Sequence, residues 1–237
     1  MSYGISEEMS LPSCLRNDDM MMKKTIALFA LVAMLCSCGT TKKQSVGEPA
    51  AVTIQFNADS AYAYCAAQCA FGPRVMNSEA HEQCGIWIQQ KFQQFGYQVE
   101  TQKADLKGYD GTILKSTNIM ASMPTTEAAS RILICAHWDS RPWADNDPDS
   151  SNWRKPVMAA NDGASGVAVM LELARLLTRH DSARHVVDFL CFDAEDWGIP
   201  QWEEDVDGNS WALGAQYWAS QWKGKNVYQY AILLDMV

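Results

Sequence analysis

Three short apolar runs in the second half of the chain constrain its fold more than any other feature. They span residues 131–136, 186–192 and 230–234, and polar side chains are almost absent from them. Apolar helical patterns lie between them, at 166–177 and 211–222. Strands that alternate with helices form parallel sheets, and near-continuous apolar strands are buried on both faces. We therefore expect an α/β fold with a mixed, largely parallel central sheet flanked by helices.

The first half of the folded region is predicted to add more helix and two further strands. Residues 58–96 have a helical pattern that is interrupted by a loop at 71–74, and a glycine at position 96 ends the helix. Strands are expected at 97–101 and near 112–114, on either side of a glycine-containing turn.

The N-terminal region has the pattern of an export signal. Lys23 and Lys24 precede an apolar run at 26–35, which is too short to span a bilayer stably. Leucine at −3 and serine at −1 before Cys38 resemble a bacterial lipobox, which implies cleavage before Cys38 and acylation of its thiol. A plain secretory signal is the alternative. The acidic residues upstream of the basic pair are atypical of a signal, so we expect translation to begin at Met21 or Met22.

These features divide the chain into three parts. Residues 1–37 are the upstream segment and lipoprotein signal peptide, 38–52 form a polar, flexible tether, and 53–237 form the folded domain. We expect an exported lipoprotein that its lipid anchors to the membrane, on the periplasmic side or on the outer-membrane face.

Charge and composition exclude two classes of protein. The chain has 19 basic and 28 acidic residues, a net charge of −9, which argues against nucleic acid as a partner. Its 48% of hydrophobic residues excludes a disordered polyanion.

Five cysteines lie beyond the lipobox. Cys135 and Cys191 fall inside apolar runs and are expected to be buried. An oxidising compartment would allow either Cys65 or Cys69 to pair with Cys84.

Acidic and imidazole side chains follow the predicted strands directly. Because the carboxyl ends of parallel strands meet at one edge of a sheet, these side chains are expected to converge there. So many carboxylates would repel one another in a dry crevice unless a cation lay among them. Mixed histidine and carboxylate ligands suit zinc, and an open site suits catalysis. The side chains concerned are His137, Asp139, Asp162, Glu195, Asp196 and Asp235.

The ordered combination of motifs around these residues resembles a known superfamily. AHWDS, AANDGASGVAVMLELAR, FLCFDAED and LLDMV are similar to the zinc-dependent aminopeptidase superfamily, and within it to bacterial glutaminyl-peptide cyclotransferases (glutaminyl cyclases). FGPRV and AHEQCGIWI resemble the N-terminal helix region of that group, so the match runs from about residue 56 to the last residue.

The resemblance implies a role for each matching residue. Asp162 and Asp196 would be zinc ligands, and Glu195 the general acid and base. In the cyclases, which hold one zinc, Asp235 would contact the substrate amine. In the two-metal peptidases, His137 and Asp235 would instead hold a second zinc that Asp162 bridges to the first.

The resemblance also implies features around the metal. Trp202 matches, with a one-residue offset, a tryptophan of the cyclase substrate pocket. Trp138 is a second candidate for that pocket. The alternative is simple surface or core packing for Trp202, and core packing for Trp138. A cis peptide bond is expected between Asp162 and Gly163. The last zinc ligand of the family, a histidine, would lie beyond Val237, so we expect the catalytic domain to be incomplete at its C-terminus and inactive by itself.

Three functions are compatible with these patterns. The first is zinc-dependent cyclisation of the N-terminal glutamine of peptides and proteins to pyroglutamate, with release of ammonia. The second is a zinc aminopeptidase that releases N-terminal amino acids. The third is a binding lipoprotein without activity. The aromatic segment 197–202 favours the cyclase.

Overall fold

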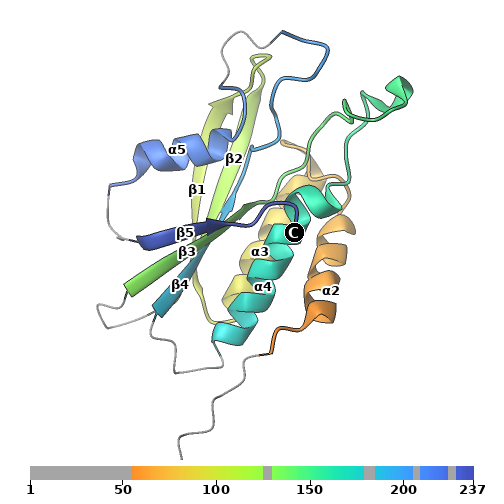
Figure 1. The fold of residues 1–237 in the computed structure, drawn as a ribbon. Helices are drawn as coiled ribbons and strands as arrows, with labels where there is room; N and C mark the ends of the chain where they lie inside the picture. The colour runs from red at the N-terminus through yellow and green to blue at the C-terminus, as the bar shows by residue number, and fades with distance from the viewer. Residues whose placement is uncertain (1–54, 125–129, 179–184, 205–208, 224–227) are drawn as a thin grey trace, which may run out of the picture. The chain divides into compact units, whose positions relative to one another are not determined.

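The computed structural model describes residues 55–124, 130–178, 185–204, 209–223 and 228–237 (Figure 1). All of them belong to one structural unit, Thr53–Val237. The predicted signal peptide, Cys38 and most of the tether lie outside the described residues. Within the described residues, no helix combines the length and the apolar character needed to cross a bilayer.

The described strands form one mixed sheet with the order β1-β2-β4-β3-β5. Their bounds are β1 Gln98–Lys107, β2 Ile113–Ser122, β3 Ser130–His137, β4 His185–Phe192 and β5 Tyr228–Leu233. β1 pairs antiparallel with β2, and β2 antiparallel with β4, whereas β3 pairs in parallel with both β4 and β5. The expected mixed sheet is confirmed, and its parallel part is the β4–β3–β5 half.

The β1–β2 hairpin is longer than the sequence indicated. Each strand has ten residues, whereas five and three were expected. The β1 side chains are mostly exposed and polar, so the apolar signal that marks a buried strand is absent from most of its length.

Among the described residues, four α-helices flank the sheet (Figure 1). α2 (Ala58–Cys69), α3 (Glu79–Gln94) and α4 (Gly166–Leu177) lie on one side, and α5 (Leu213–Gln221) lies on the other. Asn57 and Ser78 cap α2 and α3, because their side chains accept hydrogen bonds from free N–H groups of the first turn. Two short helices, η1 (Ser150–Asn152) and the π-helix η2 (Ala160–Ser165), complete the set.

The main core lies between the sheet and helices α3 and α4. Ile88 and Phe92 of α3, Leu171 of α4 and Phe189 of β4 are fully buried in it. The Phe92 and Phe189 rings stack with their centroids 5.5 Å apart. Burial of side chains of this size contributes about 1.5–3 kcal/mol each. This core supports the strands that carry the polar residues described below.

The cysteines of the folded region are free thiols. Cys135 and Cys191 are buried, as the sequence predicted. Cys84 is buried as well, and burial raises the pKa of its thiol to about 12. The pairing of Cys84 with Cys65 or Cys69 that an oxidising compartment would allow does not occur in this structure.

Candidate metal centre

The polar residues that follow the strands meet at one edge of the sheet, as expected. His137 is the last residue of β3, Glu195 and Asp196 follow β4, and Asp235 is the second residue after β5. β3, β4 and β5 are parallel, so their carboxyl ends lie side by side. Asp162 reaches the same place from η2, at the start of α4.

His137 is at the centre of this group. Its side chain is 4% exposed, and its Nε2 atom lies 2.9 Å from Asp162 Oδ1 and 3.7 Å from Asp235 Oδ1. On the other side of the ring, Nδ1 lies 3.9 Å from Glu195 Oε2. The acids are more open: the side chains of Asp162 and Asp235 are 46% and 43% exposed. The imidazole is therefore fixed, while solvent can reach two of the carboxylates.

A break in the backbone presents Asp162. Asp162 has extended angles (φ −83°, ψ 99°) inside η2, and Gly163 has φ 103°. The peptide bond between them is trans, so the expected cis bond was wrong. The positive φ of the glycine reverses the chain there without a cis bond. A Cβ atom at position 163 would lie 2.7 Å from the carbonyl oxygen of Asp139, so only glycine fits.

A buried carboxylate holds the segment that carries Glu195 and Asp196. Asp139 is fully buried and accepts hydrogen bonds from the backbone N–H groups of Glu195 (3.0 Å) and Asp196 (3.1 Å). Burial disfavours its charge, but His137 and these N–H groups hold the pKa of Asp139 below its ordinary value. Asp139 thus orients the segment, a role that its place after a strand did not reveal by itself.

The site brings several carboxylates together where solvent has little access. Burial, with the nearby charges of Asp139 and Asp162, raises the pKa of Asp196 to about 9. Burial opposes protonation of His137, yet the nearby carboxylates of Asp139 (3.5 Å from Nδ1) and Asp162 (2.9 Å from Nε2) raise its pKa to about 11. Burial also raises the pKa of Glu195. Without a cation, Asp196 and His137 therefore keep their protons at neutral pH.

The donor atoms fit a metal ion. His137, Asp162 and Asp235 can each direct one donor atom to a common point, as can His137, Glu195 and Asp196. Asp196 Oδ2 and His137 Nδ1 are buried without a hydrogen-bond partner. A buried oxygen and a buried nitrogen without hydrogen-bond partners favour the binding of a cation that both atoms can coordinate. Carboxylate oxygens and imidazole nitrogens are ligands that zinc prefers.

The two groups differ from the ligand set that the sequence suggested for a single zinc. That set paired Asp162 with Asp196, whereas the structure places these two carboxylates in different groups that share His137. His137 is therefore central to the geometry, although the cyclase resemblance gave it only a secondary place.

An aromatic cluster follows Asp196. Trp143 contacts Trp197 and Trp202 edge to face, at 5.3 and 6.3 Å between ring centroids. Trp153 stacks with Trp202, and the guanidinium of Arg154 lies 4.4 Å from the Trp202 ring. Trp202 is thus part of an aromatic surface next to the site, and it is only partly buried.

Trp138 has a different place. It is 1% exposed, belongs to the main core and stacks on His81 of α3. Of the two alternatives that the sequence left open, core packing is the one observed, because α3 and β2 cover the indole.

Arg141 joins the two loops that border the site, and sequence reasoning missed it. Its side chain forms a buried ion pair with Asp145, with Nη2 2.5 Å from Oδ2. It also donates to the carbonyl oxygens of Asp196 and Gly198. The sequence around Arg141 did not predict this role, because a single arginine in a loop is usually exposed to solvent.

Fold and site together define a protein of the zinc exopeptidase type. The structure superposes on a Zn-dependent exopeptidase from Parabacteroides distasonis with a TM-score of 0.74 and 46% sequence identity, over 77% of this chain and 62% of that chain. Residues 118–237 match the model of peptidase family M28. The chain belongs to this family.

Two further similar structures are glutaminyl cyclases. One, from Bacteroides thetaiotaomicron and bound to N-acetylhistamine, is 47% identical, with a TM-score of 0.73 over 77% of this chain and 63% of that one. The other, from Tannerella forsythia, is 44% identical, with a TM-score of 0.73 over 77% and 62%. The chain therefore spans less than two thirds of the length of these structures.

Proposed function

We propose that the protein converts the N-terminal glutamine of peptides and proteins into pyroglutamate and releases ammonia. The observation that carries this proposal is its 47% identity to the B. thetaiotaomicron glutaminyl cyclase over 77% of this chain. The aromatic cluster beside Asp196 supports it, because aromatic side chains suit a narrow pocket that excludes water.

In this reaction the substrate α-amine attacks the γ-carboxamide carbon, a C–N bond forms, and the amide nitrogen leaves as ammonia. Glu195 takes a proton from the amine and delivers it to the departing nitrogen. Its side chain is 33% exposed and its pKa is raised by burial, which suits a group that must act first as base and then as acid. Bound zinc would polarise the γ-carbonyl oxygen.

The other residues bind and orient. Asp235 is exposed enough to meet the substrate amine and lies next to His137. Asp162 and Asp196 would hold the zinc, and His137, which shares a possible donor group with each of them, lies between the two carboxylates. Trp202, as part of the aromatic cluster, would enclose the glutamine side chain.

An aminopeptidase is the second candidate, and one observation favours it. Two groups of donor atoms share His137, an arrangement that offers places for two metal ions. With two zinc ions, Glu195 would deprotonate a water molecule that attacks the peptide carbonyl. The cyclase proposal carries one zinc per chain, so the metal content separates the two candidates.

We also propose that the protein is exported and attached to a membrane through lipid on Cys38, with residues 38–52 as a tether to the catalytic domain. The support is the lipobox-like sequence before Cys38. Its substrates would then be the N-termini of exported peptides and proteins.

A paired assay on the full-length, zinc-loaded protein tests the function. A peptide that begins with glutamine should release ammonia and lose about 17 Da without cleavage, the mass of the ammonia that departs when the amide is displaced. Leucine anilide should remain intact. Anilide hydrolysis would favour the aminopeptidase, and inactivity on both substrates would favour a binding protein. The same peptide with N-terminal asparagine is the matched control.

A further inference from the structure

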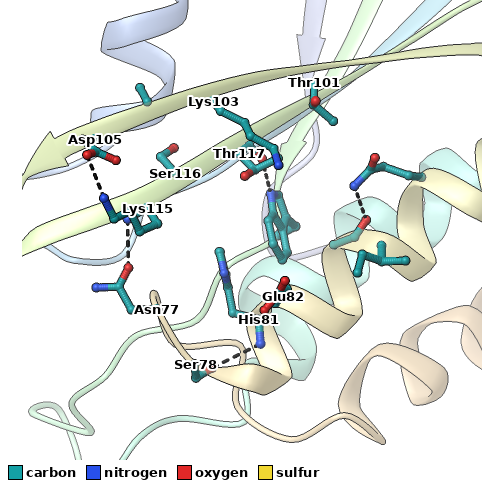
Figure 2. A pocket seen from close by; sticks show the side chains of 15 residues that line it. Asn77, Ser78, His81, Glu82, Thr101, Lys103, Asp105, Lys115, Ser116 and Thr117 are labelled. Carbon is teal, nitrogen blue, oxygen red and sulfur yellow. Dashed lines mark hydrogen bonds and ion pairs between the residues drawn. The ribbon is translucent and has the colours of Figure 1, made fainter.

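His81 is a buried histidine on α3 that the proposed reaction does not use. Its side chain is 6% exposed, and its Nε2 atom lies 2.8 Å from Asp193 Oδ1. It also borders a cavity of about 610 Å³ between α3 and the β1–β2 hairpin, which Figure 2 shows from close by. This cavity is lined by α3, β1 and β2 rather than by the residues of the candidate metal centre.

The partner of His81 is a fully buried carboxylate at the end of β4. Asp193 accepts hydrogen bonds from the backbone N–H groups of Thr117 (2.6 Å) and Ala194 (2.9 Å). A buried carboxylate needs a charged or strongly donating partner as well. His81 is the side chain that supplies this partner.

Asp193 anchors the segment that leads to Glu195. The next residue, Ala194, has φ 52°, in the left-handed region that a residue with a Cβ atom occupies only at a cost of about 1–3 kcal/mol. The segment keeps this conformation because both ends are tied. Asp193 holds the N-terminal side, and Asp139 accepts from the N–H groups of Glu195 and Asp196.

The ring of His81 is itself fixed. Trp138 stacks on it with the ring centroids 4.2 Å apart and an angle of 15° between the planes. The Trp138 indole is held in turn by a hydrogen bond to the carbonyl oxygen of Thr117. Gly85 allows this packing, because a Cβ atom there would lie 2.8 Å from the indole. His81 therefore connects a rigid part of the core to the segment that carries the reactive carboxylates.

We infer that His81 is a positioning residue: through Asp193 it sets the placement of Glu195 and Asp196, and with it catalysis and metal affinity. The catalytic part of this inference rests on the proposed function, whereas the metal part does not. Removal of a group that orients a metal ligand typically costs about 10- to 100-fold in metal affinity or activity.

The test compares two variants of the full-length protein. His81→Gln keeps an N–H donor at a reach close to that of Nε2, whereas His81→Asn is too short to reach Asp193. For His81→Asn we expect kcat and zinc affinity to fall about 10- to 100-fold, with KM changed less than about threefold because the substrate-binding groups are untouched. His81→Gln should restore most of both. The cavity beside His81 lets water fill the space that asparagine leaves, so this variant is expected to fold.

A matched control separates positioning from a general loss of stability. Arg131 pairs with the buried Asp188 in the middle of β4, five residues before Asp193, with Nη2 2.5 Å from Oδ1. Arg131→Leu should lower the free energy of unfolding, measured by urea titration, while kcat and zinc affinity remain near those of the parent. The inference is overturned if His81→Asn keeps its kcat and zinc affinity, if His81→Gln is no better than His81→Asn, or if Arg131→Leu loses both in the same proportion.

The two proposals can fail independently. If the parent protein has neither cyclase nor peptidase activity, the proposed function fails, but the zinc affinities of the three variants, measured by competition with a chelating dye, still decide whether His81 positions Asp196.

Discussion

At the scale of single residues, the site depends on buried carboxylates that do not themselves face the substrate. Asp139 accepts from two N–H groups, so the side chains of Glu195 and Asp196 remain free for other partners. One oxygen of Asp196 then stays buried without a donor. Asp139 thus makes the segment rigid, and the buried Asp196 oxygen is left without a hydrogen-bond donor. A bound cation would interact favourably with this oxygen.

Glu195→Gln should remove the proton transfer and leave the metal in place. Loss of a general acid and base lowers kcat about 10²- to 10⁴-fold, and KM should change little. Steady-state kinetics with a glutamine peptide measure the loss, and zinc content measured by atomic absorption is the control. Turnover near that of the parent protein would remove Glu195 from this role.

Zinc binding should release protons near neutral pH. The pKa of Asp196 lies at about 9 without metal, above its ordinary value of 3.8, so the carboxyl is protonated at pH 7 and must ionise to bind zinc. Apparent zinc affinity should therefore rise as the pH is raised toward 9. Calorimetric titrations in buffers with different ionisation enthalpies measure the protons released, and an affinity that does not change with pH would contradict this prediction.

The raised pKa of Asp196 also determines how the free energy of unfolding changes with pH. The folded, metal-free protein holds a proton on Asp196 that the unfolded chain loses above pH 4, so its free energy of unfolding should fall as the pH rises from about 4 to about 9. His137, with its pKa raised to about 11, adds to the fall above its ordinary value of 6.5. Bound zinc should weaken this dependence, which urea titrations across the range would measure.

At the scale of elements, η2 decides where Asp162 points. The chain leaves helical geometry at Asp162 and Gly163 and re-enters it at Gly166, the first residue of α4. Gly166 lies against the carbonyl oxygen of Leu234, so a side chain there would push β5 away. Two glycines thus let α4 start directly against the end of β5, next to Asp235.

Gly163→Ala should lower the free energy of unfolding more than the same substitution at another glycine with a positive φ. The new Cβ would meet the Asp139 carbonyl oxygen at 2.7 Å and would also carry the positive φ of 103°. Gly96→Ala is the matched control, since φ there is 89° but nothing lies within 4 Å. A positive φ alone costs about 1–3 kcal/mol, so urea titration should show a larger loss for Gly163→Ala, with weaker zinc binding. Equal losses would mean that the close approach is unimportant.

At the scale of the whole molecule, metal binding and stability are linked. The ligands come from η2, from the last residue of β3 and from the segments after β4 and β5, which only the folded chain brings together. A ligand at 100 times its Kd stabilises the folded state by about 2.7 kcal/mol. For a domain of this size, zinc should raise Tm by about 5–10 °C.

Thermal unfolding with zinc and with a chelator measures this shift. Asp162→Asn and Asp196→Asn should each reduce it, because each removes a charged donor. If both variants kept the full rise in Tm on addition of zinc, this rise would be unrelated to the candidate site. Magnesium at the same concentration is the control for a general effect of salt.

Much of the architecture was predictable from sequence because its signals are local. Helix α4 matches its expected range of 166–177, and β3, β4 and β5 lie within two residues of expectation, since apolar runs and periodic patterns are read directly from the chain. The β1–β2 hairpin was underestimated, because its exposed strands depend on pairing between chain segments rather than on apolar side chains.

The sequence by itself determined which residue types end the strands, and therefore that His137, Glu195, Asp196 and Asp235 would converge. Only the tertiary structure decided how they are arranged. It grouped the donors around His137, buried Trp138 in the core, kept the Asp162–Gly163 bond trans and paired His81 with Asp193. The reason is physical: strand order and direction follow from local patterns, whereas contacts between side chains 112 positions apart depend on how helices and strands pack.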